Sequence, residues 1–106
     1  MLIGWTTVAT HAEADRLAAE IVTRGLAACV QVDGPVTSHY RWRGEVEQAE
    51  EFRLCCKFLP ASLGALEAFV LAHHPYETPE WIVVTADHVS EKYLSWAAAI
   101  STNSPL

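Results

Sequence analysis

Two histidines, a tyrosine and two carboxylates fall close together in the second half of the chain, in the segment His73-His74-Pro75-Tyr76-Glu77-Thr78-Pro79-Glu80. Imidazole nitrogens and carboxylate oxygens suit copper, zinc or nickel, so the segment is a candidate divalent-cation site with His73 and His74 as ligands. The alternative is structural, because a histidine in the last turn of a helix caps carbonyl groups and interacts well with the helix dipole. Adjacent helical positions also point in different directions, so both rings seldom reach one ion.

The sequence contains no arrangement typical of an enzyme. It has no nucleophile elbow, and its five glycines are scattered instead of forming a phosphate-binding loop. The three cysteines lack the spacing of a zinc site, and we expect buried free thiols in a reducing compartment. Lys57 lies among apolar strand residues, which places it at an edge or an interface. An enzyme that uses Lys57 and the carboxylates is the weakest hypothesis, and we expect no catalysis.

Composition narrows the class of protein. The chain has 106 residues, of which 51% are hydrophobic, and a net charge of -6. This length predicts one domain over residues 1–106. The negative charge argues against nucleic acid, which needs a basic footprint. No apolar run approaches the ~18 residues that span a membrane, and no signal peptide precedes the first strand, so we expect a cytoplasmic protein without membrane insertion.

The candidate site must be positioned by elements in the order strand, helix, strand, strand, helix, strand, helix. The first six form a split βαβ arrangement, an α+β ferredoxin-like fold whose four-stranded antiparallel sheet carries two helices on one face. The other face is expected to be bare and to carry residues such as Cys29, Phe52 or Leu54. The predicted strands cover 2–8, 27–42, 45–58 and 81–85, and the second of them is expected to bend at a bulge around Asp33-Gly34-Pro35. The predicted helices cover 11–24, 60–74 and 91–100, followed by a frayed tail over 101–105.

Local signals fix several boundaries. Thr10 and Glu13 have the spacing of a capping box, which predicts a helix start. Gly25 stands where a glycine ends that helix, and Pro75 ends the next one near His74. The acidic stretch over residues 45–51 is expected to be a solvated strand edge that discourages aggregation.

The longest feature is a hairpin over residues 36–58. Its second strand could span roughly 45 Å, whereas a domain of this size is about 35 Å across, so the tip should extend beyond its own domain. A three-residue loop over 42–44 is expected, since it would put Tyr40 and Trp42 on the same face as Val46. Because a lone ribbon is marginal in water, the hairpin predicts an obligate homo-oligomer. The alternative is a strongly coiled hairpin that folds back over its own helices.

Five short segments together carry a family resemblance. In chain order they are Leu26-Ala27-Ala28-Cys29-Val30, Thr37-Ser38-His39-Tyr40-Arg41-Trp42-Arg43-Gly44, Lys57, the histidine segment from His73 to Glu80, and Tyr93-Leu94-Ser95-Trp96. With these spacings the chain resembles the divalent-cation tolerance protein family, CutA, over nearly its whole length. The resemblance implies a ferredoxin-like subunit in a tight, PII-like homotrimer, with the long hairpins swapped onto neighbouring subunits.

The resemblance also implies binding of copper or another divalent cation. In some bacterial members the copper ligands are a cysteine on the first strand and the paired histidines, which carry over onto His73 and His74. The cysteine position corresponds to Thr6, so the soft ligand is lost and a weaker, harder site is implied. Trp81 and Val89 also depart from the family pattern and are expected to alter packing around the last helix. The family's inter-subunit pocket carries over onto Cys29, Trp42, Lys57, His74, Tyr76 and Glu80.

Two functional hypotheses follow. The first is a cytosolic homotrimeric divalent-cation tolerance protein that binds copper or another divalent metal without catalysis. Binding should then weaken as the histidines protonate, around or below pH ~6.5. The second is a trimeric signalling or scaffold module whose inter-subunit clefts bind a small molecule or a protein loop through Lys57, Trp42 and Tyr76.

Overall fold

The computed structural model describes residues 1–102, so most of the tail for which fraying is expected lies outside the described residues. The elements follow one another in the predicted order. They are β1 (Leu2–Val8), α1 (His11–Thr23), β2 (Cys29–Trp42), β3 (Glu45–Phe58), a short 3-10 turn η1 (Pro60–Ser62), α2 (Leu63–His73), β4 (Ile82–Thr85) and α3 (Glu91–Thr102).

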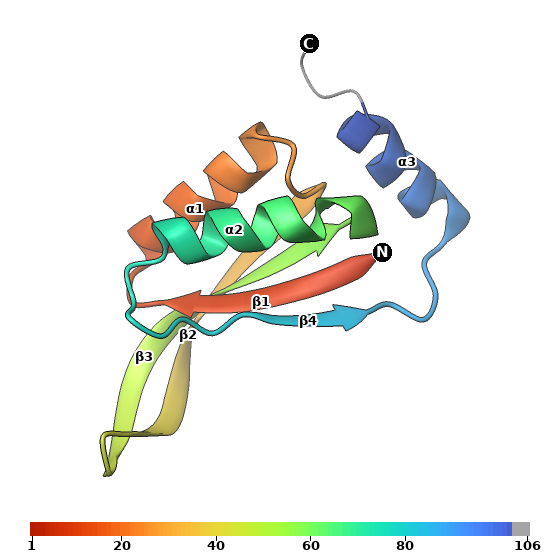
Figure 1. Ribbon diagram of the computed structural model, residues 1–106. Coiled ribbons are helices and arrows are strands. Elements are labelled where there is room, and N and C mark those ends of the chain that lie inside the picture. Colours follow the sequence, from red (N-terminus) through yellow and green to blue (C-terminus); the bar gives the residue numbers. More distant parts are fainter. Residues whose placement is uncertain (103–106) are drawn as a thin grey trace.

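The four strands form one antiparallel sheet in the order β2-β3-β1-β4, the ferredoxin-like order. Helices α1 and α2 lie together over one face of this sheet (Figure 1). Helix α3 stands apart from them, and the ammonium nitrogen of Lys57 on β3 lies 6.0 Å from the ring centroid of Tyr93 on α3. The predicted α+β, ferredoxin-like fold is therefore confirmed.

The core lies between the sheet and the helices α1 and α2. Leu54, Cys56 and Phe58 of β3 are fully buried there, because alternate residues of a strand share one face. The expectation that Phe52 or Leu54 lies on the bare face is therefore wrong, since both pack against this core. Cys29 lies opposite Lys57 on the other face, as expected.

Gly4 and Trp81 make a close contact at the edge of the core. A Cβ atom on Gly4 would lie only 2.6 Å from Cη2 of Trp81, so the absence of a side chain makes room for the indole. The ring stacks on Phe58 with 6.4 Å between centroids, and its Nε1–H donates to Glu67 Oε1 over 3.0 Å. Trp81 thereby ties β4 to β1, β3 and α2.

The helix boundaries follow the predicted capping signals. The Thr10 hydroxyl accepts the Glu13 N–H over 3.2 Å and donates to the Glu13 carboxylate over 3.1 Å, so the carboxylate bonds the hydroxyl and not the backbone N–H of Thr10. Gly25 has φ 72° just beyond α1, and α2 ends at His73, before Pro75. Among residues 1–102 no helix is long and apolar enough to cross a lipid bilayer.

A β-bulge divides the hairpin into two registers. At its base Asp33 lies opposite Arg53, but beyond the bulge Val36 lies opposite Glu51, so two residues of β2 face one residue of β3. The bend predicted around Gly34 is confirmed. The bulge moves the pairing by one residue along the rest of the hairpin.

The predicted three-residue loop is wrong because of this shift. Continued without the bulge, the base register would put Arg41 opposite Glu45 and leave residues 42–44 in the loop. Instead Trp42 lies opposite Glu45, and the turn consists of Arg43 and Gly44, with φ 51° and 82°. Two successive positive φ angles match the twist of the strands. The tip lies beyond the core, so no buried face could select the other register.

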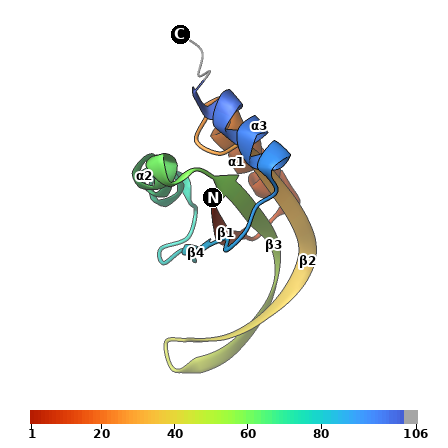
Figure 2. The ribbon, with the colours of Figure 1, turned by 90° about the vertical axis from the view of Figure 1, so that its right-hand side faces the viewer.

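The hairpin beyond the sheet bends in a broad arc toward the segment that joins α2 to β4 (Figure 2). The longest dimension of the molecule is 45 Å. In this register Tyr40 and Trp42 share a face with Glu47 and Glu45, whereas Val46 points to the opposite face.

Candidate functional site

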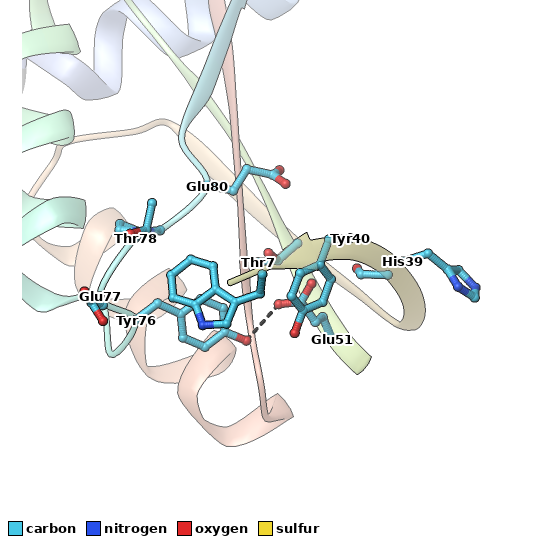
Figure 3. A pocket seen from close by; sticks show the side chains of 11 residues that line it. Thr7, His39, Tyr40, Glu51, Tyr76, Glu77, Thr78 and Glu80 are labelled. Carbon is cyan, nitrogen blue, oxygen red and sulfur yellow. Dashed lines mark hydrogen bonds between the residues drawn. The ribbon is translucent and has the colours of Figure 1, made fainter. Parts of the chain in front are cut away.

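A cleft of about 780 Å³ lies between the bent hairpin and residues 76–80. Figure 3 shows Glu77, Thr78 and Glu80 on one side and Tyr40 on the other, while His39 points away. This volume is in the range of small-molecule sites. The lining residues are Thr7 of β1, Ser38, His39, Tyr40 and Trp42 of β2, Glu51 of β3, and Tyr76, Glu77, Thr78, Pro79 and Glu80 of the following segment.

The floor of the cleft holds a hydrogen bond between a phenol and a carboxylate. The hydroxyl of Tyr76 donates to Oε2 of Glu51 over 2.7 Å (Figure 3). Glu51 is buried, with only 8% of its surface exposed. Burial raises the pKa of the Tyr76 hydroxyl, and the bond to Glu51 raises it further. The phenol therefore keeps its proton and serves as a donor to the carboxylate.

Glu80 adds a second carboxylate beside Glu51. Burial raises the pKa of Glu80, and the negative charge of Glu51 acts in the same direction, while Arg53 opposes both. The guanidinium of Arg53 is itself engaged by Asp33, with Nη2 lying 2.9 Å from Oδ2. The cleft therefore carries the negative charges of Glu51 and Glu80, while the cation that acts on Glu80, Arg53, is paired with Asp33.

An exposed ion pair joins the hairpin turn to Glu77, a residue of the cleft lining. Nη2 of Arg43, in the hairpin turn, lies 3.4 Å from Oε2 of Glu77. The same guanidinium carbon lies 5.5 Å from the ring centroid of Trp42. Both charged side chains are more than 70% exposed, so the pair contributes little energy but links the hairpin tip to the loop.

His74 holds the loop to β1. Its Nε2–H donates to the Thr7 carbonyl over 2.9 Å, and its Nδ1 accepts the Tyr76 N–H over 3.1 Å. Burial lowers the pKa of His74, although the bond to Thr7 opposes this. The ring also meets the Tyr76 ring edge to face, with 4.8 Å between centroids. Both ring nitrogens of the neutral imidazole are therefore in use.

His73 points elsewhere. Its Nδ1 lies 2.9 Å from the Phe69 carbonyl oxygen, and its ring stacks on Phe69 with 4.2 Å between centroids. Its Nε2 is the nitrogen still open to a ligand among the described contacts. In this conformation the two histidines offer one open nitrogen, and a shared ion would require His74 to release a hydrogen bond. Metal binding by His73 and His74 stays a prediction.

Thr6, at the position of the family's cysteine ligand, is fully buried on the helix-facing side of β1. Its hydroxyl oxygen has no hydrogen-bond partner within the described part of the chain. Over residues 1–102 no group of three or more His, Cys, Asp or Glu side chains could hold a metal ion. One subunit therefore does not assemble the implied ligand set by itself.

The structure brings together half of the predicted inter-subunit pocket. Trp42, Tyr76 and Glu80 line the cleft, and His74 lies behind Tyr76. Cys29 and Lys57 lie opposite each other near the other end of the sheet. Lys57 is six residues from Glu51 along β3, which is about 20 Å. That all six residues meet at a subunit interface stays a prediction.

Glu51 and Tyr40 are two of the cleft residues that sequence reasoning missed. Glu51 was expected on a solvated acidic edge, but Tyr76 covers it. Its position beside Phe52, where the strand enters the core, was the available signal. Tyr40 was expected to share a face with Val46, and the bulge moves it to the face of Glu51.

Comparison with known proteins agrees with this architecture. The family model described as CutA1 divalent ion tolerance protein matches residues 2–99. A divalent-cation tolerance protein CutA of Escherichia coli O139:H28 (strain E24377A / ETEC) is 38% identical over 93 residues, which are 88% of this chain and 83% of that protein. The structure of CutA from Synechococcus elongatus PCC7942 is 36% identical, with a TM-score of 0.91, and the match covers 94% of this chain and 88% of that one.

A more distant structure has the same fold. The periplasmic divalent cation tolerance protein CutA from Archaeoglobus fulgidus is 27% identical, with a TM-score of 0.90, and the match covers 95% of this chain and 99% of that one. The resemblance carried by the five sequence segments is thus confirmed. The chain belongs to the CutA1 divalent ion tolerance protein family.

Proposed function

We propose that this chain forms a homotrimeric, non-catalytic divalent-cation tolerance protein of the cytoplasm, with one domain over residues 1–106. Family membership supports the link to divalent cations. The observation that carries the proposed assembly is the hairpin, which extends beyond the sheet with Val46 74% exposed. A ribbon of two strands without a further layer is marginal in water, so a second copy is the simplest cover.

The uncovered sheet face offers the matching surface. Ile82 and Val84 of β4 lie on the face opposite the core, with 53% and 42% of their surfaces exposed. Val46 lies on the hairpin face that points away from the cleft. The proposed contact therefore buries the Val46 face and the β4 surface, and it does not use the hairpin face that carries Tyr40 and Trp42.

Native mass spectrometry tests the assembly. We expect a trimer for the wild type and for Leu71→Glu, a matched control at a 50% exposed position on α2. The double variant Ile82→Glu/Val84→Glu should dissociate, because it would bury two unpaired negative charges in an apolar interface. A monomeric wild type would overturn the proposed trimer.

We further propose that copper or another divalent cation binds through His73 and His74. Because His73 and His74 together present a single open imidazole nitrogen in the described contacts, the site requires release of His74 or ligands from a neighbouring subunit. Isothermal titration with Cu²⁺ at pH 7.5 should show uptake by the wild type and by the exposed control His88→Gln. Uptake should be lost in His73→Ala/His74→Ala. Equal uptake by this double variant would exclude the histidine site.

A second candidate function is a trimeric signalling or scaffold module that binds a small molecule in the cleft. The cleft itself favours this function, because it combines a suitable volume with aromatic and carboxylate side chains. A thermal-shift screen discriminates the two candidates. Stabilisation by divalent cations alone supports the first, and stabilisation by an organic compound supports the second.

A further inference from the structure

We propose that the cleft between the hairpin and residues 76–80 binds a small organic ammonium ion, a primary or quaternary alkylammonium, between aromatic rings and carboxylates. This inference rests on the second proposed function and names the ligand class of that site. It follows from the charge of the lining, from the rings that face the cleft, and from the poor match of the site to a bare metal ion.

All fixed charges of the lining have one sign. The ionisable acids are Glu51, Glu77 and Glu80, and no lysine or arginine is among the lining residues. The guanidinium group of Arg43 pairs with Glu77, and that of Arg53, whose charge also acts on Glu80, pairs with Asp33. Within residues 1–102 neither Glu51 nor Glu80 forms an ion pair, and an ammonium group is the charge that would complement them.

The environment of these carboxylates adds to the attraction. Glu51 is buried and receives one neutral donor, the hydroxyl of Tyr76. The pKa of Glu80 is raised by burial and by the charge of Glu51, which means that the two carboxylates lie close enough to repel each other. A bound cation relieves this repulsion and replaces the lost hydration.

The rings suit an organic cation. Tyr40 and Trp42 remain 44% and 41% exposed, and with Tyr76 they give the cleft three aromatic side chains. Cations are attracted to the faces of such rings, most strongly to tryptophan, and aromatic cages for alkylammonium ions use this effect. Trp42 already receives the guanidinium of Arg43 at 5.5 Å, so the ring interacts with a cation in this structure.

A bare divalent ion fits less well. Hard cations take six or more oxygen ligands, or keep their waters, and they gain little from aromatic walls. Within residues 1–102 no three ligand side chains converge on one point that could hold a metal. A volume of about 780 Å³ with apolar rings instead matches an ion that has both charge and hydrocarbon surface.

The test uses the full-length protein with butylammonium as the probe and 1-butanol as its neutral counterpart, followed by tryptophan fluorescence and saturation-transfer NMR at constant ionic strength. We expect saturable binding of butylammonium, and no binding of 1-butanol. Glu80→Gln and Trp42→Leu should each weaken binding by about 2–30-fold, the range expected for loss of one charge or one cation–π contact. Glu20→Gln, an exposed helical control paired with Arg24, should leave binding unchanged.

Three results would overturn the inference. The first is equal binding of butylammonium and 1-butanol, and the second is wild-type affinity in both Glu80→Gln and Trp42→Leu. The third is tighter binding to Lys57→Met than to the wild type, which would mean that a lysine of a neighbouring copy fills the cleft. Native mass spectra report the trimer separately, so a wild-type trimer that does not bind butylammonium rejects only this inference.

Discussion

Tyr76 donates its phenolic hydrogen to Glu51 over 2.7 Å, and this bond joins the loop after α2 to the hairpin strand β3. The residues are 25 positions apart in sequence. Because His74 bonds both Thr7 and the Tyr76 N–H, the same loop is also held to β1. The wall of the cleft is therefore held by two long-range hydrogen bonds, from Tyr76 to Glu51 and from His74 to Thr7, which the sequence does not indicate.

Replacement of Tyr76 by phenylalanine should lower the free energy of unfolding by about 1–3 kcal/mol. The buried Glu51 carboxylate would lose its donor while remaining desolvated, and an unsatisfied buried acceptor costs about this much. Urea unfolding at pH 7.5 measures the change. Tyr40→Phe, at an exposed position, should change stability by less than about 0.5 kcal/mol.

A double-mutant cycle checks the cause. In the Glu51→Gln background the carboxylate charge is absent, so Tyr76→Phe should cost less than in the wild type. If the two substitutions add without coupling, the hydrogen bond does not stabilise the fold.

Gly34→Ala should disturb the hairpin and destabilise the protein by about 1–3 kcal/mol. Gly34 has φ 146°, and an added Cβ would lie 2.8 Å from the Phe52 ring and 3.0 Å from the Glu51 carbonyl oxygen. Such a φ strains any residue with a side chain. Gly64→Ala in α2, where nothing lies within 4 Å of the new Cβ, should instead be neutral or stabilise by up to about 1 kcal/mol. Equal effects of the two substitutions would contradict the strained bulge.

Gly4→Ala should cost about 1–3 kcal/mol through overpacking against Trp81. The new methyl group would lie 2.6 Å from Cη2 and would displace the indole from Phe58 and Glu67. Combining it with Trp81→Val should cost less than the sum of the two single substitutions, because the smaller side chain removes the clash. Thermal unfolding of the three variants measures the coupling, and strict additivity would contradict the contact.

Cys56 should make the protein less stable at alkaline pH. Burial raises the pKa of this thiol from its ordinary value of 9.0 to about 12, so the folded state keeps the proton that the unfolded state releases. The stabilisation that comes from the raised pKa of the thiol is complete below pH 9 and is lost as the pH rises toward 12. At pH 10.5 the loss is about 2 kcal/mol.

Urea unfolding at pH 8 and pH 10.5 measures how far the free energy of unfolding falls between these pH values. Cys56→Ala and Cys56→Val both lack the thiol and should show a shallower decline than the wild type, whatever their stability at pH 8. If the decline is the same in all three proteins, the buried thiol does not account for it.

Much of the fold could be predicted because its signals are local. Thr10, Gly25 and Pro75 mark helix ends through their own backbone and side-chain chemistry. Strand β3 was also predicted, but its local pattern did not say which face the helices cover, and Leu54 was assigned to the wrong one. The candidate site was harder to predict from the sequence. The hydrogen bond from His74 to the Thr7 carbonyl joins residues 67 positions apart, and spacing near His74 contains no trace of it.

The hairpin shows a second limit, since two registers fit its residues and differ by one step. A regular ladder with a three-residue loop and a bulged ladder with a two-residue turn use the same side chains. The bulge at Gly34, about ten residues from the turn, produces the second of these registers.

One consequence of the bulge concerns how this surface can change. Strand β2 contains two alternate sets of side chains, and its pairing decides which set faces the loop. With the bulge, Tyr40 and Trp42 accompany Glu47 and Glu45. With a straight ladder, the same two rings would turn outward, and His39 and Arg41 would turn inward. The composition of this wall thus depends on one step in strand pairing. A single slip would replace its aromatic rings with His39 and Arg41, opposite the same glutamates of β3, without altering any amino acid.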